Sequence, residues 1–230
     1  MTEYAFAPAP ITSVEVSGSR ARFPVHRIYC VGRNYAEHAR EMGKDPTREP
    51  PFFFLKPTDT LVMNGDEVPY PVRTANFHHE IELVVAIGKG GRGIASERAL
   101  EHVFGYAVGN DYTRRDLQLA ARDKGRPWDT GKACSAAITA IHPVAQVGHV
   151  ARGRIWLAVN AAVRQQADVA DLIWSVPETI AELSTLFELK PGDLIYTGTP
   201  AGVGPVSVGD VVAGGIDGLD QLENRIGAGG

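Results

Sequence analysis

The segment HHEIELVVAIG carries two glutamates, Glu80 and Glu82, separated by a single position. In a β-strand their side chains point to the same face, because successive side chains alternate. That face continues with Val84 and Ala86, so we expect a largely buried strand with two partly desolvated carboxylates at its start. Like charges this close are unfavourable unless a cation or protons compensate them. The pair is therefore a candidate cation site.

A third acid, Asp111, ends the strand-like run VFGYAVGND, where side chains of different strands can converge. Three carboxylates without a cluster of His or Cys suit a hard cation such as Mg²⁺ or Mn²⁺. Zinc is disfavoured, because HHEIEL is not the HExxH motif. The alternative is that Glu80 and Glu82 form ion pairs with arginines such as Arg114 and Arg115. The residues alone leave both interpretations open.

A helix is expected directly after this acid, over the run RRDLQLAARDKG. Thr113 and Asp116 are three positions apart and predict a capping box at its start. Arg115, Gln118 and Arg122 follow one face at helical spacing. That face begins one turn from the predicted cation site, although a solvated surface face would show the same pattern.

A histidine and a glutamate, His38 and Glu41, are three positions apart in the expected short helix NYAEHAREMG. Their side chains can therefore meet. A carboxylate that orients one imidazole nitrogen makes the other a better base, and such a pair can take a proton from water. Pairs of this kind also occur on ordinary surfaces, so spacing alone does not establish catalysis.

Two lysines and one glycine-rich loop are further candidates. Lys56 follows the apolar run FFFL and either lines a pocket or ends a buried strand, whereas Lys132, in DTGKACS, lies among small residues and could reach a cavity. The loop TGTPAGVG lacks the features of a P-loop or a dinucleotide-binding motif, but its hydroxyls and N–H groups suit an anion. Ser135 lacks the G-x-S-x-G context of a serine nucleophile.

Composition narrows the class of protein. The 230 residues are 44% hydrophobic and 22% charged, and the net charge of −4 argues against nucleic acid as a partner. No apolar run approaches the roughly 18 residues of a membrane span, and MTEYAFAPAP does not resemble a signal peptide. Two cysteines, Cys30 and Cys134, are expected to be reduced in a cytoplasmic protein.

Strand-like segments outnumber helical ones. Short apolar runs punctuated by Gly, Pro, Asn and Asp are expected as strands, and they are residues 27–32, 66–71, 79–88, 103–111, 154–160, 193–200 and 209–216. A second clear helix is VPETIAELSTLF, beginning at Ser175 or Pro177. Residues 142–153 are expected to be a surface loop. Because regular βαβ alternation is absent, we predict a β-dominated α+β fold. Residues 1–25 are predicted to be an N-terminal appendage and residues 26–230 a single catalytic domain.

Several of these segments, taken together, resemble the fumarylacetoacetate hydrolase family. The matching segments run in family order from about Ile28 to Gly218, and they are YCVGRNYAEHAREMG, FFFLKP, NFHHEIELVVAIG, GYAVGNDYTRRDLQ, GK and LKPGDLIYTGTPAGVGPVSVGD. The resemblance implies the mixed β-roll of that family with a few short helices, and a homodimer. It also implies a bound Mg²⁺ or Mn²⁺.

The resemblance assigns a role to each candidate. It implies metal binding by Glu80, Glu82 and Asp111. It implies catalysis by His38, oriented by Glu41, with Lys132 and Gln118 stabilising an oxyanion. It places Arg33, Lys56, Arg115 and Thr199 around the charged and polar groups of a substrate.

Within that family the chain most resembles members that hydrolyse fumarylpyruvate to fumarate and pyruvate in the gentisate route of aromatic degradation. Acylpyruvases, oxaloacetate decarboxylases and 2-hydroxy-diene-dioate isomerases of the same family are alternatives, and a non-catalytic metal-stabilised binding protein is an alternative of another class. Two departures stand out. The segment ACSAAITAI follows Lys132, where many members of the family are expected to have a more aromatic and polar continuation, and this difference concerns the pocket wall near Lys132. The hairpin reads VNAAV where VNG is usual, and the loss of the glycine disfavours a primed turn.

Overall fold

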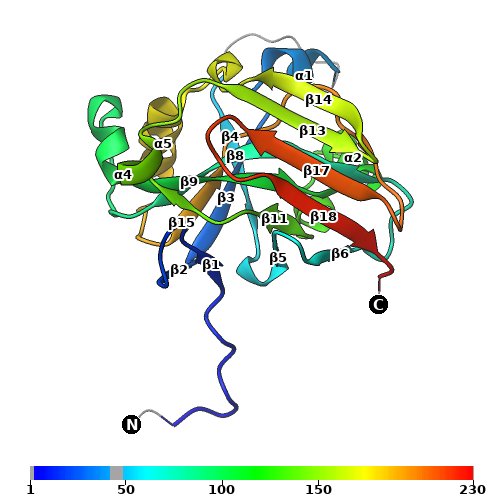
Figure 1. Ribbon diagram of the computed structural model, residues 1–230, viewed down its shortest axis with the longest axis horizontal. Helices are drawn as coiled ribbons and strands as arrows, with labels where there is room; N and C mark the ends of the chain where they lie inside the picture. The colour runs from blue at the N-terminus through cyan, green and yellow to red at the C-terminus, as the bar shows by residue number, and fades with distance from the viewer. Residues whose placement is uncertain (1–2, 42–48, 230) are drawn as a thin grey trace.

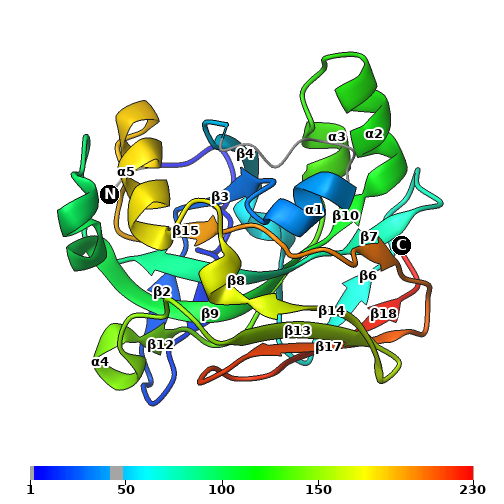
Figure 2. The ribbon, with the colours of Figure 1, turned by 90° about the horizontal axis from the view of Figure 1, so that it is seen from above.

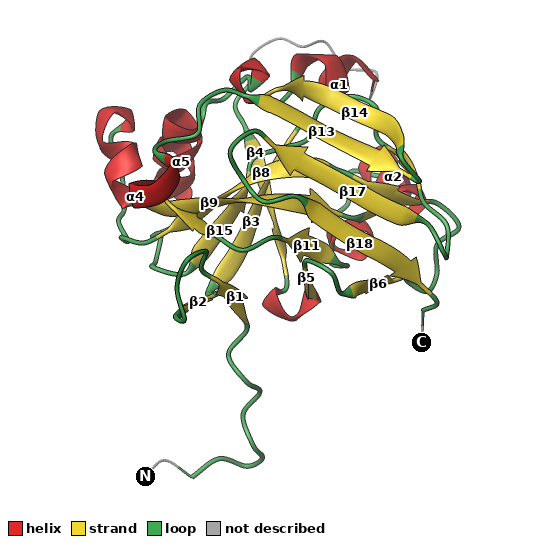
Figure 3. Ribbon diagram, viewed as in Figure 1, coloured by secondary structure: helices red, strands yellow, loops and turns green. Residues whose placement is uncertain are grey.

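The computed structural model describes residues 3–41 and 49–229, without the side chains of residues 39–41. Strands dominate it and the helices lie at the periphery (Figure 3). The predicted β-dominated α+β fold is confirmed.

The largest sheet in the described part of the chain has eight strands (Figure 1). Seven of them follow the order β4, β3, β15, β8, β9, β11, β5, and β12 pairs with β9 beyond this path. Their bounds are Phe52–Lys56, Arg27–Gly32, Asp193–Tyr196, Ile81–Ile87, Val103–Asp111, Ala136–Ile138 and Leu61–Met63 in that order, with β12 at His142–Pro143.

Strand β8 lies near the middle of this sheet, and every one of its residues is buried. Ile81, Leu83 and Val85 enter the larger hydrophobic cluster, whereas Val84 and Ala86 enter a second cluster on the opposite face. This division is the two-residue alternation that the sequence predicts.

A five-stranded sheet packs over one face of the large sheet and supplies much of the larger cluster. Its order is β14, β13, β17, β18, β6, with bounds Ala162–Asp168, Arg154–Val159, Val211–Ile216, Leu222–Gly227 and Glu67–Pro69. A three-stranded sheet joins β10, β7 and β16, which are Thr113–Arg114, Phe77–His79 and Gly204–Pro205.

The helices gather around the edges of these sheets. Their bounds are Ala36–Glu41 (α1), Arg115–Asp123 (α2), Asp129–Lys132 (α3), Val144–Val147 (α4) and Val176–Leu186 (α5), with 3-10 turns η1 at Thr58–Thr60, η2 at Ser96–His102 and η3 at Val169–Asp171. Figure 2 shows α1, α2 and α3 on one side of β8 and β9, and the five-stranded sheet on the other. Both predicted longer helices are therefore present, and α5 begins after Ser175, which forms a capping box with Glu178.

Two local predictions were wrong. Residues 142–153 are not only a loop, because they contain β12 and α4, whose Val144 and Val147 pack against the larger cluster. The predicted capping box of α2 is also absent. Thr113 lies in β10 and its hydroxyl donates to the carbonyl of Asp111, so it is not available to cap the helix.

The VNAAV hairpin keeps a two-residue connection in spite of its missing glycine. Asn160 and Ala161 join β13 to β14 with φ of 49° and 65°. A left-handed conformation costs an alanine about 1 kcal/mol or more. The Asn160 side chain offsets part of this cost, since it donates to Asp210 over 2.7 Å and accepts from the N–H of Val211 over 3.0 Å.

The N-terminal segment has two parts. Residues 3–12 extend away from the body (Figure 1), and a hairpin follows, formed by β1 (Ser13–Glu15) and β2 (Arg22–Pro24). Val14, Phe23 and Val25 of this hairpin are buried in the second cluster with residues of the large sheet. The hairpin thus shares a core with the rest of the chain, and the division at residue 25 stays a prediction.

Candidate metal centre and active site

The three predicted carboxylates meet at one end of the large sheet. Glu82 lies in β8 opposite Gly109 of β9, and the N–H of Asp111 donates to the carbonyl of Glu80 over 2.8 Å. This register places the three side chains on one face. Each offers an oxygen within 4.8 Å of the others, and none of the three is more than 4% exposed.

Two of the three carboxylates are already compensated by cations. The Lys132 ammonium lies 2.7 Å from Glu80 Oε2 and 2.6 Å from Asp111 Oδ2, so it bridges them. Arg115 donates to the other oxygen of Glu80. Burial alone would raise the pKa of Glu80, but the charges of Lys132 and Arg115 outweigh it and hold that pKa far below its usual value. The predicted alternative of an arginine pair is thus present for Glu80, alongside the cluster.

Glu82 lacks such compensation. Its carboxylate accepts one hydrogen bond, over 2.7 Å, from the N–H of Gly198. Burial, together with the charges of Asp111 and Glu80, raises its pKa well above the usual value. Gly198 comes this close because its φ is +101°, and a side chain there would meet Asn34.

This donor set fits a divalent cation. The ligand atoms are carboxylate oxygens of the kind that Mg²⁺ and Mn²⁺ prefer, and a cation would stabilise the ionised form of Glu82, which burial and the neighbouring carboxylates disfavour. The Lys132 ammonium shows that the cluster already draws positive charge between Glu80 and Asp111.

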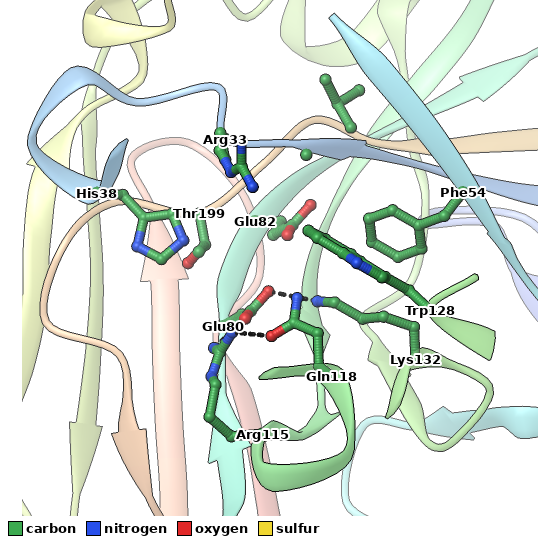
Figure 4. Close-up of a pocket in the computed structure, with 12 residues that line it drawn as sticks. Arg33, His38, Phe54, Glu80, Glu82, Arg115, Gln118, Trp128, Lys132 and Thr199 are labelled. Carbon is green, nitrogen blue, oxygen red and sulfur yellow. Dashed lines mark hydrogen bonds and ion pairs between the residues drawn. The ribbon is translucent and has the colours of Figure 1, made fainter. Parts of the chain in front are cut away.

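The cluster opens into a pocket (Figure 4). The residues that line it come from β3, β4 and β8 or lie next to these strands, and from α1, α2, α3 with the residue before it, and the loop after β15. They are Val31, Gly32, Arg33, His38, Phe54, Glu80, Glu82, Arg115, Gln118, Trp128, Lys132 and Thr199. The structure therefore brings most of the predicted site residues together.

Gln118 presents an amide donor to this pocket. Its Oε1 accepts from Arg115 Nη1, and an arginine can only donate, so the orientation of the amide is settled. The N–H₂ group then faces away from Arg115, and within the described residues it has no hydrogen-bond acceptor. Helix α2 thus supplies a preoriented donor beside the carboxylates.

His38 projects into the pocket from α1 and is 6% exposed (Figure 4). Its proximity lowers the pKa of Glu80, so the imidazole lies within electrostatic reach of the carboxylates. The side chain of Glu41, its predicted partner, lies outside the described residues.

Lys56 does not line the pocket. Its ammonium is buried behind the cluster, 2.9 Å from Asp111 Oδ1, and donates to the carbonyls of Tyr112, Lys132 and Cys134 over 2.5 to 3.0 Å. It therefore ties the strand carrying Asp111 to the segment carrying Lys132. Of the two possibilities that the sequence left open, the buried position at the end of a strand is the one observed.

Thr199 belongs to a network that the sequence did not indicate. Gln165 of β14 donates to the Thr199 hydroxyl and to the carbonyl of Pro200, both over 2.8 Å. Its Oε1 accepts from the N–H of Ile81 and from His79 Nδ1. Gln165 is 86 positions from His79 and 34 from Thr199, so no local pattern could have identified it.

Trp128 and Phe54 are two further lining residues that the sequence analysis missed. An isolated tryptophan or phenylalanine is most often a core residue, and the sequence shows no pattern that would mark these two as part of a site. Their place on the pocket wall follows from the packing of α3 against β4.

Comparisons with known proteins identify the family of this chain. The family model described as fumarylacetoacetate (FAA) hydrolase C-terminal matches residues 27–227. A fumarylpyruvate hydrolase of Ralstonia sp is 50% identical over 189 residues, which are 81% of this chain and 98% of that protein. The mitochondrial oxaloacetate tautomerase of Homo sapiens is 40% identical over 86% of this chain and 90% of that protein.

A solved structure is also similar over its whole length. It is the fumarylpyruvate hydrolase of Pseudomonas aeruginosa in complex with Mn²⁺ and pyruvate, which is 54% identical. The match has a TM-score of 0.96 and covers 98% of this chain and 100% of that one. The family model, the curated relatives and the structural match all lead to one conclusion, that this chain belongs to the fumarylacetoacetate hydrolase family.

Proposed function

We propose that this protein is a metal-dependent hydrolase that cleaves the C3–C4 bond of a 2,4-diketo acid, and that fumarylpyruvate, giving fumarate and pyruvate, is its substrate. The observation that carries the proposal is the buried cluster of Glu80, Glu82 and Asp111 beside preoriented donors in one pocket. It is supported by the likeness to a fumarylpyruvate hydrolase whose structure contains Mn²⁺ and pyruvate.

The three carboxylates would hold Mg²⁺ or Mn²⁺. When bound, the ion supplies Lewis-acid stabilisation of negative charge at the keto-acid end of the substrate. Arg115 and Thr199 both line the pocket, and we assign them to the polar groups of that end. Lys56 we assign to positioning Asp111 and Lys132, because its ammonium contacts both of their chain segments.

Hydrolysis needs a base and donors for an oxyanion. We assign the base to His38, with Glu41 as its orienting partner: it takes a proton from water while the water oxygen bonds to C4. The C4 oxygen then carries negative charge, and the N–H₂ of Gln118 with the Lys132 ammonium is placed to stabilise it. When the C3–C4 bond breaks, its electron pair stays on C3, which takes up a proton to become the methyl group of pyruvate.

A spectrophotometric assay of fumarylpyruvate, acetylpyruvate and oxaloacetate, each with Mg²⁺, Mn²⁺ or a chelator, tests the proposal. We expect cleavage of fumarylpyruvate that requires the divalent ion. A wide preference for acetylpyruvate would contradict the fumaryl assignment, and turnover in chelator would contradict the role of the metal.

Decarboxylation or tautomerisation of oxaloacetate is the second candidate. Two relatives that are each 40% identical to this chain are named an oxaloacetate decarboxylase and an oxaloacetate tautomerase. Neither reaction requires attack by water. The variant His38→Ala separates the two chemistries, since it should lose diketo-acid hydrolysis but retain turnover of oxaloacetate if the latter is the main activity.

Three finer assignments rest on the resemblance alone. We place the enzyme in the gentisate route of aromatic degradation, in the cytoplasm and as a homodimer. Light scattering of the purified protein tests the dimer, and growth of a deletion strain on gentisate tests the route. No helix in the described ranges is both long and apolar enough to cross a membrane.

A further inference from the structure

One wall of the pocket combines aromatic rings with an arginine. Trp128 lies edge-on to Phe52 at a centroid distance of 5.1 Å and tilted to Phe54 at 5.9 Å. The guanidinium of Arg33 lies 5.3 Å from the Phe52 ring centroid and 5.9 Å from that of Trp128. Figure 4 shows Arg33 entering the pocket from the segment after β3, across from Gln118 and Arg115.

The backbone holds Arg33 in this orientation. Its φ is +57°, a left-handed conformation that is unfavourable for a residue with a side chain. The next residue, Asn34, fixes the segment, because its amide donates to the carbonyls of Trp174 and Thr197 and accepts from the N–H of Trp174 over 2.7 to 2.9 Å. Strain held in this way at a pocket wall is typical of functional positions.

Arg33 differs from the other cations of the pocket, because no acidic partner lies among the described side chains around it. Lys132 is paired with Glu80 and Asp111, and Arg115 with Glu80. Among the side chains that the structure describes, those of residues 3–38 and 49–229, Arg33 makes no ion pair, and its guanidinium lies against the rings of Phe52 and Trp128. Burial and the charge of Arg122 lower its pKa, with Glu49 opposing them more weakly. An anion beside Arg33 would relieve this unfavourable environment.

We propose that Arg33, with Trp128 and Phe54, forms the acyl subsite of the pocket and selects a planar unsaturated acyl chain ending in a carboxylate. The inference rests on the proposed function and names the residue that binds the far end of its substrate. The carboxylate cluster and Gln118 take the diketo end, and the aromatic rings cover the conjugated double bond. The guanidinium donates two parallel hydrogen bonds to the distal carboxylate.

Acetylpyruvate provides the comparison, since it has the same diketo-acid end but a methyl group in place of the whole carboxyvinyl group, and so lacks both the double bond and the distal carboxylate. A hydrogen-bonded charge pair contributes about 1.5 to 3 kcal/mol, so Arg33→Gln should lower kcat/KM for fumarylpyruvate by roughly 10- to 100-fold. For acetylpyruvate the change should stay within about threefold, because no contact to a distal carboxylate is lost. Arg33→Lys should restore part of the preference, and the exposed Arg126→Gln is the control.

Product inhibition gives a second measurement that does not depend on the chemical step. Fumarate should inhibit the wild-type enzyme more strongly than crotonate, in which a methyl group replaces one carboxylate, and Arg33→Gln should remove this difference. If Arg33→Gln lowered kcat/KM equally for fumarylpyruvate and acetylpyruvate, or kept the stronger inhibition by fumarate than by crotonate, the assignment of Arg33 would be overturned. The proposed function would remain intact. Failure of the wild-type enzyme to cleave fumarylpyruvate would contradict both.

Discussion

The side-chain amide of Gln165 donates a hydrogen bond to the hydroxyl oxygen of Thr199, which therefore acts as an acceptor. The amide of Gln165 cannot be reversed, because its oxygen accepts from the N–H of Ile81 and its nitrogen donates to the carbonyl of Pro200. The Thr199 oxygen must therefore accept from Gln165 over 2.8 Å. Its own proton is left to donate elsewhere, and Thr199 lines the pocket. A residue of the five-stranded sheet thus leaves the Thr199 hydroxyl able to donate its proton into the pocket.

The first prediction tests this orientation. In Gln165→Met the Thr199 hydroxyl is free to turn and donate to the carbonyl of Pro200, so the substrate loses one hydrogen bond. We expect KM to rise by about 3- to 10-fold, the value of one neutral hydrogen bond, with a smaller change in kcat. In a Thr199→Val background the same substitution should have little further effect on KM. The exposed neighbour variant Gln166→Leu is the control, and additive losses would contradict the coupling.

The second prediction concerns the uncompensated carboxylate. Mn²⁺ should raise the melting temperature of the wild-type protein, by the equivalent of about 2.7 kcal/mol at a concentration of 100 Kd. Glu82→Gln should abolish this shift. In chelator the variant should be at least as stable as the wild type, because its neutral amide avoids the two causes that raise the pKa of Glu82, which are burial and the repulsion from Asp111 and Glu80. Scanning calorimetry with the exposed Glu97→Gln as control measures both effects, and an undiminished Mn²⁺ shift in Glu82→Gln would exclude it as a ligand.

The third prediction separates a structural role of Lys56 from contact with substrate. Lys56→Met leaves several carbonyls without their buried donor and Asp111 without one of its ion-pair partners. Breaking such a buried pair costs about 3 to 5 kcal/mol of the free energy of unfolding. Urea denaturation should show this loss, while Lys124→Met, on the surface, should be close to the wild type. Unchanged stability combined with a raised KM would instead assign Lys56 to substrate binding.

The fourth prediction concerns pH and the start of α2. Burial opposes ionisation of Asp116, but hydrogen bonds from Thr74 and from the N–H groups of Ala75 and Leu117 outweigh it and lower its pKa below 3.8. A carboxyl whose pKa is lower in the folded state stabilises the protein above its unfolded pKa, and this contribution is lost as the pH falls through the folded pKa.

Asp116→Asn should therefore be less stable than the wild type at neutral pH, by under about 1 kcal/mol for a group this well solvated. The difference should shrink as the pH falls below about 4. Denaturation curves over this range measure it, with Asp123→Asn at the other end of the helix as control. A difference that is independent of pH would show that the charge of Asp116 is not involved.

Much of the carboxylate cluster was predictable from the sequence, and the reason is local geometry. Alternation along a strand places Glu80 and Glu82 on one face whatever the rest of the chain does. The apolar continuation of that face predicts burial, and the structure confirms both. The longer helices and the dominance of strands were predictable for the same reason, because each depends on periodicity within about a dozen residues.

The surroundings of the cluster were decided by the tertiary structure. Lys132 bridges Glu80 from 52 positions away, and Gln165 reaches Thr199 from the five-stranded sheet. Arg33 meets Trp128 only because α3 packs beside β4. Such contacts depend on how sheets and helices are placed against each other, and no spacing in the sequence encodes that placement. Periodicity in the sequence thus determined which residues share a face of a strand or helix. Packing between distant segments decided that Lys132 is paired with Glu80 and Asp111, whereas Arg33 lies against aromatic rings and can bind a ligand.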